Sequence, residues 1–181
     1  MIYGERVLLR LPESDEDHEL LVNLRNHAAM KRYFYDDEPI SMESHLKWWA
    51  KVSADPSQRN YMIEATDVGK AIGLTSLVNI DFINRTAEYG RLKIAANYQR
   101  QGYAFEAEVL LMRHAFDTLN LHRVWLHALA YNEAVIKLHE KTGFQHEGCL
   151  KGHIFKHGKY EDVVTMAMSA EEFRAKYERV G

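Results

Sequence analysis

The stretch "NYMIEATDVGKAIGLTSLVNID", residues 60–81, limits what this chain can fold into. Two apolar, β-prone segments flank a short turn at Asp67 to Lys70, where Gly69 can take the positive φ that a tight hairpin turn needs. A hairpin pairs its two strands antiparallel. Because the chain does not alternate strand and helix throughout, we predict a mixed α/β domain of the α+β type, and not a doubly wound nucleotide-binding fold.

Other periodic segments predict the remaining elements. Strands are expected at 6–12, 87–97, 122–129, 144–154 and 159–168. Helix starts are indicated by Ser14 with Asp17, by Ser41, by Asn132 and by Ser169 with Glu172. Gly143 is expected to end the helix that Asn132 opens, and another helix follows residues 97–107 and continues to about Leu119.

Length and composition limit the classes of function that the chain can have. The 181 residues are typical of one domain, so residues 1–181 are taken as a single unit. A net charge of −3 gives no global reason to expect nucleic-acid or membrane binding. The lone Cys149 cannot form an internal disulfide, and no apolar run suggests a signal peptide or a membrane span. These features are typical of a cytoplasmic protein.

The stretch "NYQRQGYAFEA", residues 97–107, places one glycine in a polar bend directly before a helical pattern. A helix N-terminus has about four N–H groups without intrahelical partners and roughly half a positive charge. Gly102 would let phosphate oxygens approach these amides, and Arg100 could add a charged contact. The alternative is a plain β–α turn, since neither the dinucleotide fingerprint nor a P-loop is present.

The six residues Gln99-Arg100-Gln101-Gly102-Tyr103-Ala104 resemble the Q/R-x-x-G-x-G/A signature of the GNAT superfamily of N-acetyltransferases. Segments before and after this motif resemble the family in the same order, over nearly the whole chain. The resemblance implies a mixed, mostly antiparallel central sheet that is splayed at the coenzyme site and flanked by helices. It also implies an acyltransferase that uses acetyl-CoA as co-substrate and needs no metal.

The resemblance also implies where the coenzyme lies. Pantetheine would pair with the free strand edge at Leu92, Lys93 and Ile94, and the pyrophosphate would lie against residues 99–104. Asn132 matches the family's side-chain contact to pantetheine, although an Asn at this position can equally be a helix N-cap. Val135 stands where related chains often have Ser.

Two side chains are candidates for proton transfer during direct attack of an amine on the thioester. Many family members have a tyrosine as thiol acid in the pattern Tyr-Glu-x-x-Gly-Phe, and His139 occupies that position here. The alternative for His139 is a structural, inward-facing histidine. Glu88, at the start of the central strand, is the candidate base, and its alternative is a solvated strand-edge charge. Cys149 is not needed as a nucleophile.

The acceptor is expected to be a small primary amine bound by the first two helices and the late hairpin. Several segments resemble amino-sugar N-acetyltransferases of the pseudaminic acid pathway, so a nucleotide-linked 4-amino sugar is the leading interpretation. Spermidine, attracted by an acidic run that includes Asp36 and Asp37, and protein N-termini such as those of ribosomal proteins are the alternatives. A non-catalytic acetyl-CoA-binding module is the alternative of another class. The edge of the late hairpin would be compatible with a homodimer.

Overall fold

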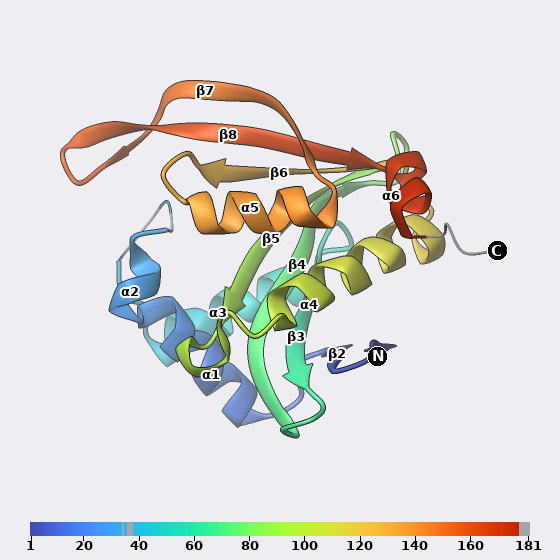
Figure 1. Ribbon diagram of the computed structural model, residues 1–181. Coiled ribbons are helices and arrows are strands. Elements are labelled where there is room, and N and C mark those ends of the chain that lie inside the picture. The colour runs from blue at the N-terminus through green and yellow to red at the C-terminus, as the bar shows by residue number, and fades with distance from the viewer. Residues whose placement is uncertain (34, 36–37, 178–181) are drawn as a thin grey trace.

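A twisted sheet of eight described strands forms the centre of the protein (Figure 1). The structure is a computed structural model that describes residues 1–33, 35 and 38–177. Every neighbouring pair of strands is antiparallel except β5 and β6, in the order β1-β2-β3-β4-β5-β6-β8-β7. The strands are β1 (Ile2–Tyr3), β2 (Val7–Arg10), β3 (Arg59–Ala65), β4 (Lys70–Asp81), β5 (Thr86–Ile94), β6 (Arg123–Leu129), β7 (Gln145–Lys156) and β8 (Lys159–Ser169). The predicted mixed, largely antiparallel sheet is confirmed.

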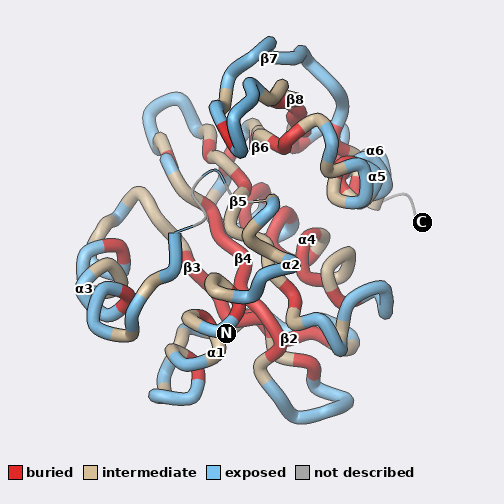
Figure 2. The backbone as a smooth tube through the Cα atoms, turned by 90° about the vertical axis from the view of Figure 1, so that its left-hand side faces the viewer, coloured by how far each residue is buried: buried red, intermediate tan, exposed pale blue. Residues whose placement is uncertain are grey.

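Helices cover both faces of this sheet. In Figure 2, α3 lies on one side of the sheet, and α4, α5 and α6 lie on the other. The helices are α1 (Asp15–Asn26), α2 (Ala28–Lys31), α3 (Met42–Ser53), α4 (Tyr103–Arg113), α5 (Glu133–Thr142) and α6 (Ala170–Tyr177). A 3₁₀ turn, η1 (Ala96–Tyr98), precedes α4, and a π-helical turn, η2 (His114–Thr118), follows it.

Alternation along the strands gives each helical layer its own apolar contacts. On β3, Ile63 belongs to the large core cluster that includes Ala107 and Leu111 of α4. The neighbouring Met62 packs instead with Leu21 of α1 in a second, smaller cluster. One strand therefore contributes side chains to two packed layers, as expected for a sheet buried on both faces.

Capping residues set the helix ends where the sequence predicted them. The Ser14 side chain accepts from the N–H of Asp17, whose carboxylate accepts from the N–H of Ser14 in return. Ser41 begins α3 in the same way with Ser44 as its partner. Gly143 follows α5 with φ +122°, a conformation that favours glycine.

One expected bound needs correction. The strand expected over 87–97 ends at Ile94, because the chain turns into η1. The helix expected to reach about Leu119 does extend to Thr118, but its last turn, after Arg113, is π-helical. The strand β1 and the short helix α2 were not predicted, since four residues or fewer carry too little periodicity to be recognised.

Candidate functional site

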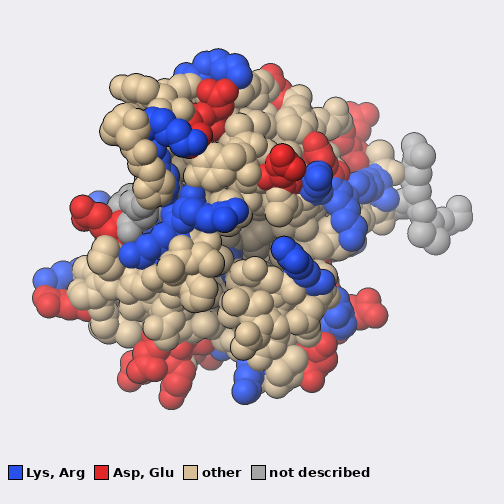
Figure 3. Space-filling model, turned by 60° about the vertical axis from the view of Figure 1, so that its left-hand side comes forward, with Lys and Arg blue, Asp and Glu red and all other residues tan. Residues whose placement is uncertain are grey.

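The sheet opens between β5 and β6. These parallel strands pair only from Thr86↔Arg123 to Glu88↔Trp125, and beyond that point they diverge. On the other side of β5 the register with β4 shifts between Leu74 and Ser76, where Arg91 has φ +56°. A cavity of about 1060 Å³ lies along the diverging strands, α5 and the start of α4. Figure 3 shows a hollow on this face with Lys and Arg side chains on both sides of it.

Two hydrogen bonds hold the end of the short helix α2 at the entrance of this cavity. The Tyr131 hydroxyl, just after β6, donates to the carbonyl of Arg32 over 2.5 Å. The buried ammonium of Lys156, near the end of β7, donates to the carbonyl of Lys31 over 2.8 Å. Met30 and Tyr33 line the cavity beside these contacts. The cavity is thereby bounded by segments that are far apart in the chain.

The bend before α4 has the geometry of an anion cradle. Gly102 is the N-cap of α4 in the left-handed conformation, with φ +92°, and no side chain caps the helix there. The first amides of α4 are therefore available to a ligand, and the helix dipole adds positive potential at the same place. Both Gly102 and Ala104 line the large cavity.

The other residues of the predicted cradle have different environments. Arg100 lines the cavity, with φ +61°. Gln99 also lines it, but its side-chain amide donates to the carbonyl of Ile94 and so holds the bend against the end of β5. Gln101 and Tyr103 do not line the cavity. The Gln101 side chain donates to the carbonyl of Asn97, and the buried Tyr103 donates its hydroxyl to Asp67, so only their main chains remain for a ligand.

The predicted pantetheine contacts flank the opening. Leu92, Lys93 and Ile94 line the cavity, and their free strand edge faces β6 because β4 occupies the opposite edge. Asn132 is the N-cap of α5, as predicted, but its side chain makes no capping hydrogen bond. Asn132 and Val135 both line the cavity. The Asn132 amide is therefore not engaged by its own helix.

His139 projects from α5 into a buried polar cluster at the cavity wall. Its Nδ1 lies 2.6 Å from Oε1 of Glu108 on α4, and Glu108 is fully buried. The hydroxyl of Thr142 donates to the second carboxylate oxygen of Glu108 over 2.9 Å. The rings of Tyr89 and Phe144 contact His139 edge-on, at centroid distances of 5.7 and 5.8 Å. Glu108 was not predicted as a site residue, although a charged residue within the apolar stretch of α4 was a usable signal.

Glu88 lies apart from His139. It stands directly before Tyr89 on β5, so the two side chains point to opposite faces of the sheet, and Tyr89 is the one that contacts His139. Glu88 Oε2 accepts a hydrogen bond from Asn79 over 2.7 Å. It does not line either of the two described cavities. The structure therefore does not bring the two predicted catalytic side chains together.

A second cavity, of about 440 Å³, adjoins β5 on the α1 and α3 side of the sheet. Arg25, Arg91 and Lys93 line it together with His45 and Trp48. Burial and the charges of Arg25 and Arg91 lower the pKa of Lys93 to about 8. Burial also lowers the pKa of Arg91, which donates to Gln58 and Asn60 and stacks over Trp48. Arg25, Arg91 and Lys93 line both cavities.

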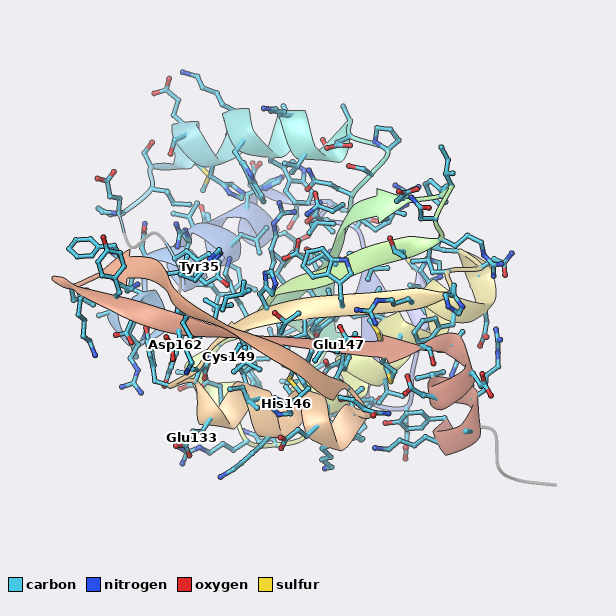
Figure 4. All side chains as sticks on the ribbon, turned by 90° about the horizontal axis from the view of Figure 1, so that it is seen from above. Tyr35, Glu133, His146, Glu147, Cys149 and Asp162 are labelled. Carbon is cyan, nitrogen blue, oxygen red and sulfur yellow. The ribbon has the colours of Figure 1, made fainter. Side chains whose placement is uncertain are left out.

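The late hairpin does not line either described cavity. Figure 4 shows Cys149 on the hairpin, and Cys149 belongs to β7, the outer strand of the sheet. Two of the hairpin's basic side chains form ion pairs within the hairpin itself: Lys151 pairs with Asp162, and Lys159 with Glu161. On the side of the first helices the two cavities are bordered, in the described residues, by α1, α2, α3 and the sheet, so the acceptor site expected between these helices and the hairpin stays a prediction. Asp36 and Asp37 of the acidic run lie outside the described residues.

Every helix in the described ranges falls short of the length and apolar character needed to cross a bilayer. The same ranges contain no cluster of three or more His, Cys, Asp or Glu side chains arranged to hold a metal ion.

The chain matches the family described as "Acetyltransferase (GNAT) domain" over residues 6–145. It is 29% identical to spermidine N(1)-acetyltransferase of Escherichia coli (strain K12) over 170 residues, covering 94% of this chain and 90% of the relative. It is 30% identical over 150 residues to the spermidine N(1)-acetyltransferase of Vibrio cholerae, covering 83% and 86%. The crystal structure of spermidine N-acetyltransferase from Vibrio cholerae in complex with CoA and spermine superposes with a TM-score of 0.85, at 30% identity, over 93% of this chain and 98% of that one.

Proposed function

Because the chain belongs to the GNAT family and is an acetyl-CoA-dependent N-acetyltransferase, we propose that it acetylates a small primary amine, with a polyamine as the first candidate acceptor. The observation that carries this proposal is the opening between β5 and β6, which continues from the cradle at Gly102 to the wall at His139. An extended coenzyme can lie along it with its diphosphate at one end and its thioester near the other. The acceptor amine would then enter from the α1 and α2 side.

The coenzyme is held mainly by main-chain groups in this proposal. The amides of α4 after Gly102 bind the pyrophosphate, and Arg100 adds a positive charge. Pantetheine runs beside the free edge of Leu92, Lys93 and Ile94, and the Asn132 amide bonds to it from α5. A backbone N–H of the β5 edge stabilises the oxyanion that forms at the thioester carbonyl.

Two steps of proton transfer are needed when the amine arrives as an ammonium ion. Glu88 accepts the first proton through water, so that the nitrogen has a free electron pair. His139 then donates a proton to the thiolate that leaves the thioester. The amine attacks the thioester directly, and no covalent enzyme intermediate forms. Cys149 is on the exposed edge strand and takes no part.

Similarity to the two spermidine acetyltransferases supports a polyamine acceptor, because it extends over most of each chain. The Vibrio cholerae enzyme, whose crystal structure is in complex with CoA and spermine, supports the same acceptor class for a chain with this backbone. The amino-sugar acceptor, which leads on sequence patterns alone, receives less support from these relatives. It becomes the second candidate here.

One feature of this chain favours the second candidate. The cavity of about 440 Å³ beside β5 is lined by Arg25, Arg91 and Lys93, and an anionic group would be attracted to three cations. A polyamine would be repelled by the same charges. A nucleotide-linked amino sugar carries phosphate groups that match this lining. The two candidates therefore differ in the sign of charge that the cavity has to accept.

Thiol release from acetyl-CoA separates these candidates. The purified chain is assayed with spermidine, with a nucleotide-linked 4-amino sugar and with a ribosomal-protein N-terminal peptide. Thiol release with spermidine at the highest kcat/KM supports the polyamine proposal, and release only with the sugar nucleotide replaces it. Binding of acetyl-CoA without thiol release from any amine would favour a non-catalytic coenzyme-binding module.

The variant Lys93→Gln helps to distinguish a cationic from an anionic acceptor in this assay. At pH 7 Lys93 is mostly charged, because its pKa is about 8. Removing this charge should lower KM if the acceptor is spermidine, and should raise KM if the acceptor is anionic. Above about pH 9 the lysine of the wild type is itself neutral, and the difference between wild type and variant shrinks. A change in the same direction for both acceptors would show that Lys93 affects the fold of β5 and not the choice of acceptor.

A further inference from the structure

A fully buried carboxylate lies between α4 and α5, next to the cavity wall. Glu108 has no exposed surface, and each of its oxygens has a partner: Nδ1 of His139 at 2.6 Å and Oγ1 of Thr142 at 2.9 Å. Burying a carboxylate costs several kcal/mol unless it is hydrogen-bonded and its charge is compensated. An apolar side chain would pack α4 against α5 without this cost. The position of Glu108 therefore calls for an explanation beyond packing.

The nearby phenols do not neutralise Glu108. Burial and the charge of Glu108 raise the pKa of Tyr89 well above its ordinary value, and the Tyr89 hydroxyl accepts from Thr75. The same two causes raise the pKa of Tyr177 to about 12, and its hydroxyl donates to the carbonyl of Thr142. Both phenols stay protonated and directed elsewhere. His139 is left as the titratable group in contact with the carboxylate.

The contact with Glu108 also decides which nitrogen of His139 faces the cavity. A carboxylate at Nδ1 favours the tautomer with a proton on Nδ1 and a free electron pair on Nε2. Nε2 makes no hydrogen bond within the described residues, and no buried polar side-chain atom in these residues is without a partner. Nε2 therefore reaches open space, and the space beside His139 is the large cavity. Tyr89 and Phe144 both contact the His139 ring edge-on and limit its rotation.

We propose that Glu108 and His139 act together as a proton relay, with His139 as the catalytic group and Glu108 as its positioning residue. This inference rests on the proposed acetyl transfer and gives His139 a wider role than that of a thiol acid. The imidazole accepts a proton at Nε2 and returns it from the same atom. Glu108 fixes the tautomer and compensates the positive charge of the imidazolium, as the carboxylate of a Ser-His-Asp triad does.

The relay balances protons and electrons for a neutral amine. The nitrogen electron pair forms a bond to the thioester carbon, and the carbonyl π pair moves to oxygen. The resulting ammonium gives one proton to Nε2 of His139. The carbonyl then re-forms, the C–S bond breaks with its electron pair on sulfur, and the imidazolium returns the proton to the thiolate. The products are the amide and free coenzyme A, and His139 ends in its initial state.

The tautomer of His139 tests the pair without any acceptor. Nitrogen NMR of the ¹⁵N-labelled protein, with His139 assigned by comparison with His139→Gln, is expected to show the proton on Nδ1. In Glu108→Gln the population should move toward the tautomer with the proton on Nε2. A proton on Nε2 of His139 in the wild type would overturn the relay, whichever amine the enzyme uses. Failure of every amine in the thiol-release assay would count against the proposed function and would leave this measurement unaffected.

Kinetics with the best acceptor test the relay in action. His139→Gln is expected to lower kcat about 10²- to 10⁴-fold, and Glu108→Gln about 10- to 100-fold, with the coenzyme Kd changed less than about threefold in each. The double variant should lose about as much as His139→Gln alone, because residues that act as a unit are not additive. Thr142→Val, which removes one hydrogen bond to Glu108, should lower kcat less than Glu108→Gln and serves if Glu108→Gln does not fold.

Asp17→Asn is the matched control. Asp17 is another buried carboxylate, paired with Arg10 at the start of α1 and away from the cavity linings. Its substitution should lower the unfolding temperature and leave kcat within about twofold of the wild type. If Glu108→Gln behaves in the same way, Glu108 only joins α4 to α5 and the relay is wrong.

Discussion

A Cβ atom on Gly102 would lie 3.0 Å from Nη2 of Arg6, in the segment before β2. The same guanidinium donates to the carbonyl of Gln101 over 3.2 Å and lies over the ring of Tyr103, at 4.9 Å from its centroid. Glu106 completes this arrangement by accepting from the N–H groups of Arg6 and Val7. The N-terminal segment therefore packs against one side of the bend before α4. The first amides of α4 remain open to the cavity on the other side.

Gly102→Val should weaken acetyl-CoA binding by about tenfold or more. A β-branched residue at φ +92° costs about 1–3 kcal/mol of strain, and its side chain would displace Arg6 or tilt the amides away from the diphosphate. Isothermal titration calorimetry with acetyl-CoA measures the effect.

Gly158→Val is the control for this variant. Gly158 lies in the turn between β7 and β8 and also has positive φ, at +79°. A Cβ atom added there would meet no heavy atom of another segment within 4 Å. Both variants should lose similar thermal stability, and only Gly102→Val should lose affinity for the coenzyme. Equal coenzyme affinity in the two variants would contradict the cradle.

Asn132→Ala separates helix capping from ligand binding. Loss of a capping side chain costs about 0.5–2 kcal/mol. Because the Asn132 side chain makes no capping bond, we expect less than about 0.5 kcal/mol of destabilisation. Coenzyme affinity should fall about three- to tenfold, the equivalent of one lost hydrogen bond. Urea unfolding and calorimetry measure the two effects.

Ser14→Ala is expected to do the reverse, because the Ser14 hydroxyl does cap its helix. It should lose about 1 kcal/mol of unfolding free energy and keep its coenzyme affinity. A large stability loss in Asn132→Ala with unchanged coenzyme affinity would assign Asn132 to the helix alone.

The sequence predicted best those features that a single residue or a short pattern determines. Ser14 and Ser41 begin helices because a hydroxyl satisfies amides three residues on, and this chemistry is local. Gly143 ends α5 because few other residues adopt its φ. The bend at Gly102 belongs to the same class, since a glycine before a helical pattern can be recognised without knowing the rest of the fold.

Features that depend on two distant segments were not predicted. Glu108 and His139 are separated by β6 in the chain, and only the packing of α4 on α5 brings them together. The cation-lined cavity likewise combines Arg25 of α1 with Arg91 and Lys93 of β5. His139 could be identified from the sequence, but its partner Glu108 could not. Helix periodicity predicts which side of a helix a residue lies on, and it does not predict which residue of another helix packs against that side.

Glu88→Gln should lower turnover at neutral pH more than at high pH. If Glu88 accepts a proton from an ammonium substrate, its role disappears once the amine is deprotonated in solution. The kcat/KM ratio of wild type to variant should therefore decrease toward 1 as the pH approaches the amine's own pKa. Asn79→Ala, which removes the hydrogen bond to Glu88 and keeps the carboxylate, should retain most activity at every pH. A loss of the same size at all pH values in Glu88→Gln would indicate a role in binding or structure.

Acidification should destabilise the packing of α1 on α3 through His45. Its Nε2 lies 3.0 Å from Nδ1 of His18, and its ring packs against Trp48 and Trp49. Burial, followed by the neighbouring His18 and Lys93, lowers the pKa of His45. Below about pH 6.5 the unfolded chain therefore binds a proton that the folded protein resists, and the free energy of unfolding decreases as the pH falls.

The unfolding temperature of the wild type should accordingly drop more between pH 7 and pH 5.5 than that of His45→Gln. Carboxylates contribute little in this window because their ordinary pKa values lie lower. An equal drop in wild type and His45→Gln would contradict this prediction, because it would mean that His45 binds its proton equally well in the folded and the unfolded chain.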